Sequence, residues 1–158
     1  MKSASRAAGV RCIPPEISAY NLRMGRSAIN RRGVFAMQDI PRNRQVIEYV
    51  GERLSWPQAL HSARKLRKLG KPPNLYLARL NRRWIINGAV GGNLSRFINH
   101  CCDPNLDKRA VHGRLLFFSR REIRAGQELT FDYRFRRDSA KMVCHCGSPK
   151  CRGTINLR

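Results

Sequence analysis

Apolar residues along the chain fall in short runs that turn residues interrupt, a pattern typical of β-strands joined by tight turns. Residues 45–50 are an example, because Val46, Ile47 and Tyr49 precede a turn at Gly51. The runs that predict strands cover residues 33–40, 45–50, 75–80, 83–88, 114–119 and 128–135. Mostly β-structure is therefore expected.

One segment, about 56–70, has helical periodicity instead. Ser55 is suited to cap its first turn, and Gly70 is suited to the left-handed position that ends many helices. The apolar residues that recur at helical spacing are Leu60, Ala63, Leu66 and Leu69. We therefore predict a short helical insert in a β-rich domain.

The expected strand over 128–135 is rich in aromatic residues. Because side chains alternate along a strand, Phe131, Tyr133 and Phe135 would share one face and Asp132 would lie on the other. Residues 88–105, by contrast, mix Gly, Asn and apolar residues in a way that predicts no regular element.

Composition adds a strong positive charge to this picture. The 158 residues suffice for one domain, and no apolar run approaches the ~20 residues of a membrane-spanning helix, so no membrane span is expected. Lys and Arg number 32 against 10 Asp and Glu, a formal charge of +22. Basic residues concentrate at Arg64–Lys71 and Arg134–Arg137. Direct nucleic-acid contact through this surface is one consequence to expect, although charge alone indicates no chemistry.

The cysteines suggest a metal site. The first residues lack the apolar region of a secretory signal, so the thiols are expected in a reducing, intracellular compartment, where metal binding is more frequent than disulfides. Cys144, Cys146 and Cys151 supply three ligands for a tetrahedral zinc, which needs four. The candidates for the fourth ligand are Cys102, Cys101, His145 and Cys12. Four thiolates would leave no open position, which favours structural zinc.

Four motifs, in this order, resemble those of one family. They are EYVGE at 48–52, RFINHCCDPN at 96–105, ELTFDY at 128–133 and CHCGSPKC at 144–151. Together they are similar to the SET-domain protein-lysine methyltransferases with a post-SET zinc motif. The resemblance implies small β-sheets, a knot-like threaded segment (β-clip) and a zinc-bound tail.

The same resemblance suggests how the chain is organised. It implies an N-terminal arm over 1–20, a SET domain over 21–137 with its helical insert at about 56–70, and a post-SET zinc segment over 138–158. With no cysteine-rich segment before the SET domain, the chain resembles the short stand-alone members of the family, including bacterial ones.

The resemblance also implies the reacting residues. Tyr133 corresponds to the tyrosine at the reaction centre, and Tyr49 lines the same channel, with Phe131 and Phe135 beside it. Phe131 occupies a position that influences how many methyl groups fit, and Phe in place of Tyr predicts di- or trimethylation. The implied zinc ligands are Cys102, Cys144, Cys146 and Cys151.

S-adenosyl-L-methionine is the implied methyl donor, with S-adenosyl-L-homocysteine as its product. The residues implied to contact it are Arg32, Gly33, Val34, Arg96, Phe97, Asn99, His100 and Tyr133, with Arg96 and Phe97 chiefly supporting the threaded loop. One departure is Arg31, which stands where the family usually has the first Gly of Gly-x-Gly. If that position needs a positive φ, an arginine there costs about 1 kcal/mol.

The expected function is S-adenosylmethionine-dependent methylation of lysines in histones or other DNA-associated proteins. Two alternatives remain: a basic zinc module that binds nucleic acid or chromatin without catalysis, and a SET pseudoenzyme. The expected location is the nucleus or chromosome in a eukaryote and the cytoplasm or nucleoid in a bacterium. A basic substrate tail would need acids in its groove, and those available are Glu48, Glu52, Asp103, Asp107 and Asp138.

Overall fold

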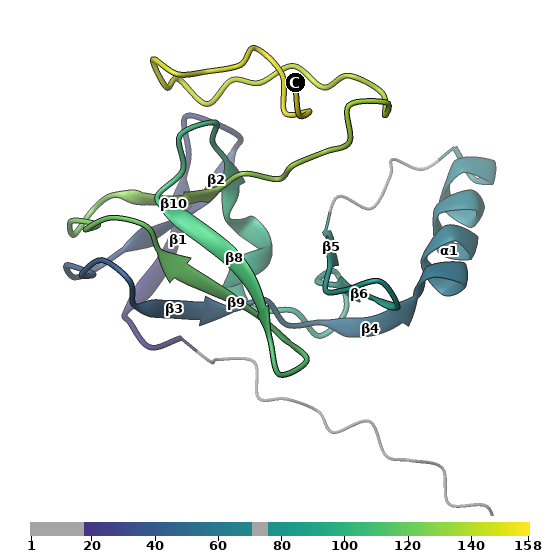
Figure 1. Ribbon diagram of the computed structural model, residues 1–158, viewed down its shortest axis with the longest axis horizontal. Helices are drawn as coiled ribbons and strands as arrows, with labels where there is room; N and C mark the ends of the chain where they lie inside the picture. The colour runs from purple at the N-terminus through teal and green to yellow at the C-terminus, as the bar shows by residue number, and fades with distance from the viewer. Residues whose placement is uncertain (1–17, 71–75) are drawn as a thin grey trace, which may run out of the picture.

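The computed structural model describes residues 18–70 and 76–158, in which β-strands predominate (Figure 1). The larger sheet has seven strands in the described residues. They are β1 (Leu22–Arg26), β2 (Arg32–Ala36), β3 (Gln45–Glu48), β7 (Asn99–His100), β8 (Leu106–Val111), β9 (Arg114–Ser119) and β10 (Glu128–Phe131). Their order is β1-β2-β10-β8-β9-β3, with β7 also paired to β10.

The strand that comes last in the sequence, β10, lies inside this sheet. It pairs antiparallel with β2, where Leu129 faces Val34, and parallel with β7, where Thr130 faces Asn99. Its end, Phe131, pairs with Leu106 of β8. This insertion of a late strand between earlier ones brings the 96–105 and 128–133 motifs side by side.

A smaller antiparallel sheet carries the helix. Its strands, β4 (Glu52–Ser55), β5 (Leu77–Arg79) and β6 (Trp84–Asn87), have the order β4-β6-β5. Helix α1 (Trp56–Lys68) follows β4 and lies to one side of the main sheet (Figure 1). The C-terminal tail runs across the top of the view, above β2 and β10 (Figure 1).

The predicted helix is confirmed together with its caps. The Ser55 backbone N–H donates to Gln58 Oε1 at 2.8 Å, and the Gln58 N–H approaches Ser55 Oγ at 3.5 Å, which is a capping box. Gly70 has φ +62. The apolar spacing does not mean burial, however, since Leu60 and Leu69 are 50% and 58% exposed. The helix lies at the edge of the small sheet, where its main contacts are with β4 and β6.

The predicted fold class, mostly β with one short helix, is confirmed. Strand 114–119 has the predicted bounds, whereas the expected strand over 128–135 was too long and ends at Phe131. Arg134 explains the early end, because its φ of +53 is incompatible with an extended strand. The segment 88–105, for which no element was predicted, contains a 3-10 helix, η1 (Leu94–Phe97), and β7.

Two sequence-based expectations lie wholly or partly outside the described residues. Most of the predicted arm, 1–20, precedes residue 18, and the predicted strand 75–80 begins at residue 75. In the part of the chain that the structure describes, no helix is long and apolar enough to cross a membrane.

Candidate active site

Aromatic side chains gather where β10 ends. The Phe131 ring lies 4.8 Å from Phe117 and 4.7 Å from Tyr133, measured between centroids. Tyr133 in turn lies 5.7 Å from Phe135, and Tyr49 contacts Phe117 edge-on at 6.3 Å. The structure therefore brings the three expected channel residues, Tyr49, Phe131 and Phe135, together with Tyr133, although only Phe131 of these belongs to a strand.

Both tyrosine hydroxyls are held by backbone carbonyl groups. Tyr133 Oη donates to the Ile98 carbonyl at 2.9 Å, and Tyr49 Oη donates to the Tyr76 carbonyl at 2.8 Å. Burial raises the pKa of each phenol above its ordinary value, because it disfavours the phenolate. Both hydroxyls are consequently neutral hydrogen-bond donors at physiological pH.

These aromatic residues line a cavity of about 230 Å³, smaller than the ~300–1,000 Å³ of pockets that take whole small molecules. Leu77, Ala78 and Ile98 complete its uncharged wall. Its remaining lining residues are all basic: Arg79, Arg96, Lys108, Arg134 and Arg136. A narrow aromatic cavity with a cationic rim suits a single long side chain rather than a bulky ligand.

Arg31 precedes β2, whose first residues lie against β7 and β10. Arg31 has φ +42, so the position does require the left-handed conformation that glycine adopts most easily. Gly33 is buried, and a Cβ there would collide with the Glu128 carboxylate. The Asn99 side-chain amide lies 2.7 Å from the Arg32 carbonyl and 2.7 Å from Glu128 Oε1. Asn99 thus fastens the start of β2 to β7 and β10.

His100 connects the reaction-centre tyrosine to the cysteines. Its Nδ1 accepts the Tyr133 backbone N–H at 3.2 Å, so the ring proton lies on Nε2, which faces Cys102 Sγ at 3.4 Å. Burial lowers the pKa of His100, and the opposing effect of Asp132 does not reverse this. A neutral His100 therefore donates toward a cysteine sulfur while holding the Tyr133 backbone.

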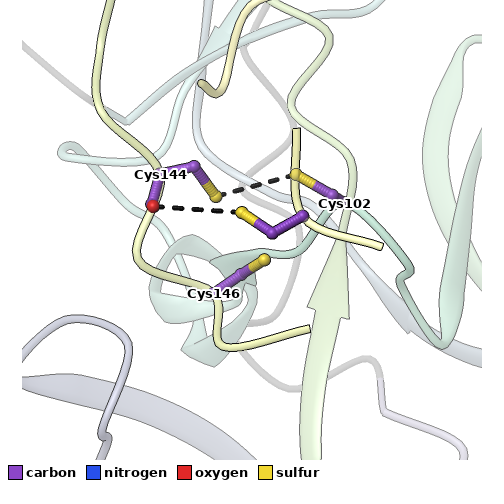
Figure 2. Close-up of side chains that lie close together, drawn as sticks. Cys102, Cys144 and Cys146 are labelled. Atoms are coloured by element: carbon purple, nitrogen blue, oxygen red, sulfur yellow. Dashed lines mark hydrogen bonds between the residues drawn. The ribbon is translucent and has the colours of Figure 1, made fainter. Parts of the chain in front are cut away.

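Four cysteines form one cluster (Figure 2). The sulfur atoms of Cys102, Cys144, Cys146 and Cys151 all lie within 4.8 Å of one another, and Cys102 and Cys144 are 3.7 Å apart. Tetrahedral zinc with bonds of ~2.3 Å places its sulfur ligands about 3.8 Å apart, so the set fits this metal. Backbone N–H groups of the tail point at two of the sulfurs, as around zinc thiolates.

Of the four candidates for the fourth ligand, the structure brings Cys102 to the other three cysteines. Cys101 is buried nearby and His145 is exposed, but neither belongs to the cluster, and Cys12 lies outside the described residues. Cys102 follows β7, so a metal here would join the tail to the 96–105 segment.

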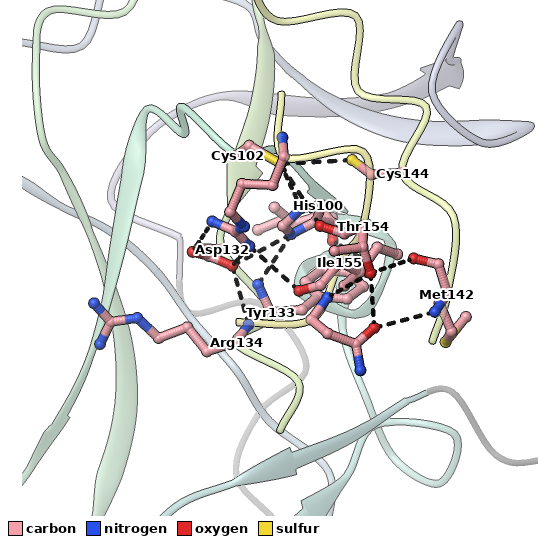
Figure 3. A network of polar contacts seen from close by, with 12 residues as sticks. His100, Cys102, Asp132, Tyr133, Arg134, Met142, Cys144, Thr154 and Ile155 are labelled. Carbon is pink, nitrogen blue, oxygen red and sulfur yellow. Dashed lines mark hydrogen bonds and ion pairs between the residues drawn. The ribbon is translucent and has the colours of Figure 1, made fainter. Parts of the chain in front are cut away.

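An ion pair holds the tail to the end of β10 as well (Figure 3). The Arg152 guanidinium donates to both oxygens of Asp132, at 2.8 and 2.9 Å. Asp132 also accepts the Arg134 N–H at 3.1 Å. Burial alone would raise the pKa of Asp132, but these donors hold it below its usual range. Asp132 is therefore a structural anchor directly before Tyr133.

Sequence reasoning missed several residues of this region. Glu128 accepts from Ser27 Oγ at 2.9 Å as well as from Asn99, and Lys108 enters the aromatic cavity from β8. Arg152 completes the tail anchor. Glu128 is the first residue of the 128–133 motif and Arg152 directly follows the 144–151 motif, but no motif contains Lys108. The roles of all three depend on which strands pair.

A SET-domain family model matches residues 31–134, so the chain belongs to the SET-domain family. A Saccharomyces cerevisiae relative named "Histone-lysine N-methyltransferase, H3 lysine-4 specific" is 38% identical over 138 residues, 83% of this chain and 13% of the yeast protein. Histone-lysine N-methyltransferase set1 of Dictyostelium discoideum is 38% identical over 139 residues, 85% of this chain and 9% of that protein.

Human histone-lysine N-methyltransferase SETD1A is 37% identical over 140 residues, which are 85% of this chain and 8% of the human protein. The chain thus corresponds to a small fraction of the length of each relative.

Proposed function

We propose that the protein is an S-adenosyl-L-methionine-dependent protein-lysine N-methyltransferase acting on histones or other DNA-associated proteins. The observation that carries the proposal is the narrow aromatic cavity at the end of β10, with Tyr133 at its wall, together with the start of β2 that Asn99 fastens to β10. Relatives named as histone-lysine N-methyltransferases support the same reaction.

Methyl transfer needs a neutral amine. A free lysine has a pKa of about 10.4, so near pH ~7.5 only about one side chain in a thousand is neutral. The aromatic wall of Tyr49, Phe131 and Tyr133 excludes water and disfavours the ammonium form. Tyr133, kept neutral by burial and fixed by the Ile98 carbonyl, orients the amine toward the methyl group.

S-adenosyl-L-methionine supplies the electrophilic methyl group when it is bound. We assign its binding to the start of β2 and the segment that includes β7, which Asn99 joins. Arg96 and Phe97 support this region, since the Arg96 guanidinium stacks 4.7 Å from the Phe97 ring centroid. The residues proposed to bind the cofactor are Arg32, Gly33, Val34, Arg96, Phe97, Asn99, His100 and Tyr133.

The proposed zinc is structural. Cys102, Cys144, Cys146 and Cys151 would fill all four positions of a tetrahedral site and leave none for a reacting water. Its role is to hold the tail against β7 and β10, where the Asp132–Arg152 pair acts in the same direction.

Transfer of labelled methyl groups to a panel of histones and DNA-binding proteins tests the proposal. Label on lysines that is lost with Tyr133→Phe supports it. Calorimetry with S-adenosyl-L-methionine alone tests the alternatives: a basic nucleic-acid-binding module or a pseudoenzyme would bind no cofactor and transfer no label.

A further inference from the structure

The charged side chains that line the cavity proposed to receive the substrate lysine are all positive. Among the residues that the structure describes, five that line it are basic and none is acidic. Four of the acidic residues that were expected to receive a basic tail already pair with arginines. Glu48 is buried and pairs with Arg114, and Asp138 pairs with Arg136, itself a lining residue. Asp103 and Asp107 contact arginines outside the cavity. Glu52 accepts from the Asn87 side chain at 3.2 Å and does not line the cavity.

Four of the five lining cations have no carboxylate partner among residues 18–70 and 76–158: Arg79, Arg96, Lys108 and Arg134. Arg96 instead donates to the Gly88 carbonyl and stacks on Phe97, which leaves Arg79, Lys108 and Arg134 for a ligand. Arg79 Nε donates to the Asn81 carbonyl, which leaves its charge uncompensated. The Arg134 side chain extends away from the polar network around Asp132 (Figure 3). Both arginines are exposed, so their guanidinium groups remain available at the rim.

Lys108 brings the positive charge into the cavity itself. It is half-buried, and its Nζ lies 5.4 Å from the centroid of the Phe131 ring. Burial and the neighbouring Arg134 lower the pKa of Lys108, with Asp132 acting in the opposite direction. A basic peptide entering here would place further cations against these three residues, none of which pairs with a carboxylate in the described part of the chain.

We infer that the substrate class is a lysine flanked by aspartate or glutamate residues, whose carboxylates pair with Arg79, Lys108 and Arg134 around the aromatic cavity. The inference rests on the proposed function. A peptide fits better than a nucleic acid, because the cavity is narrow and aromatic and one cation lies within it. Uncompensated cations select partners by complementarity and reject like charge.

Three matched peptides test this, each with one lysine flanked on both sides by Glu, by Ala or by Arg. Fluorescence anisotropy measures binding, and transfer of labelled methyl groups measures turnover. With two exposed ion pairs formed, we expect the Glu peptide to bind about tenfold more tightly than the Ala peptide and the Arg peptide to bind most weakly. The difference should shrink as salt rises to about 0.5 M.

Charge-matched variants separate the rim from the overall +22 charge. Arg79→Glu with Arg134→Glu should remove the preference for the Glu peptide and favour the Arg peptide. Arg23→Glu with Arg42→Glu makes the same change in net charge at exposed positions that do not line the cavity, and should keep the preference.

A preference for the Arg peptide by the unaltered protein, or equal loss of preference in both variants, would overturn the inference. The inference would also be overturned if the rim variant weakened binding of a DNA duplex more than binding of the Glu peptide. The rim would then be a nucleic-acid surface. Binding preference without methylation supports the inference and contradicts the proposed reaction. Methylation of all three peptides without a binding preference supports the proposed reaction and contradicts the inference.

Discussion

The anchor between Asp132 and Arg152 offers a quantitative test of how the tail is held. The two charge-assisted hydrogen bonds measure 2.8 and 2.9 Å, and the side chains are only 20% and 17% exposed. Breaking a fully buried pair costs about 3–5 kcal/mol, whereas an exposed pair contributes about 0–1 kcal/mol. For this mostly buried pair we expect Arg152→Gln to lower the free energy of unfolding by about 2 kcal/mol.

Urea unfolding of the zinc-loaded protein measures this, in a cycle of Arg152→Gln, Asp132→Asn and the double variant. The two single changes should not add, because each removes the same interaction, and the coupling should be about 1–2 kcal/mol. Arg136→Gln is the matched control: its pair with Asp138 also joins a guanidinium to a carboxylate but is 82% and 65% exposed, so little change is expected. Equal effects at Arg152 and Arg136 would refute the reasoning.

The remaining predictions concern the pH dependence of stability, the degree of lysine methylation and the removal of zinc. Since the pKa of Asp132 is lowered on folding, its contribution to stability is present above its unfolded pKa of ~3.9 and is lost as pH falls through the folded value. The stability difference between the unaltered protein and Asp132→Asn should therefore shrink at low pH, as urea unfolding at several pH values will show; a constant difference would contradict this. Phe131→Tyr should shift products toward monomethyl-lysine, because the added hydroxyl crowds the amine, and mass spectrometry resolves them; strictly monomethyl product from the unaltered protein would refute the assignment. A zinc chelator should release one metal per chain and expose the tail to protease, while leaving residues 21–70 and 76–137 resistant; unchanged cleavage of the tail would argue against a structural zinc.

Much of the fold was predictable where the sequence pattern is local. Strand 114–119 follows from a short apolar run bounded by turn residues, and the capped helix follows from helical spacing, Ser55 and Gly70. The exposure of the helix was not predictable. Leu60 and Leu69 have the spacing of a buried face, but they remain exposed because the helix lies at the edge of a small sheet. Strand β10 shows the same limit, since the positive φ of Arg134 interrupts an alternation that continues in the sequence.

The candidate site was predictable only through its motifs. Tyr49, Phe131, Tyr133 and Phe135 meet as the resemblance implies. No motif in the sequence contains Lys108. Its place in the cavity follows from the pairing of β8 with β10 and β9. Long-range pairing is what the periodicity of a single segment cannot encode.

The most direct test of the central claim is the mass of a substrate peptide after incubation with the protein and S-adenosyl-L-methionine. Two peptides that differ only in Lys or Arg at the target position are compared, with the unaltered protein and with Tyr133→Phe. The account predicts added methyl groups on the lysine peptide alone, strongly reduced by Tyr133→Phe. Methylation of the arginine peptide, or full activity of Tyr133→Phe, would contradict it.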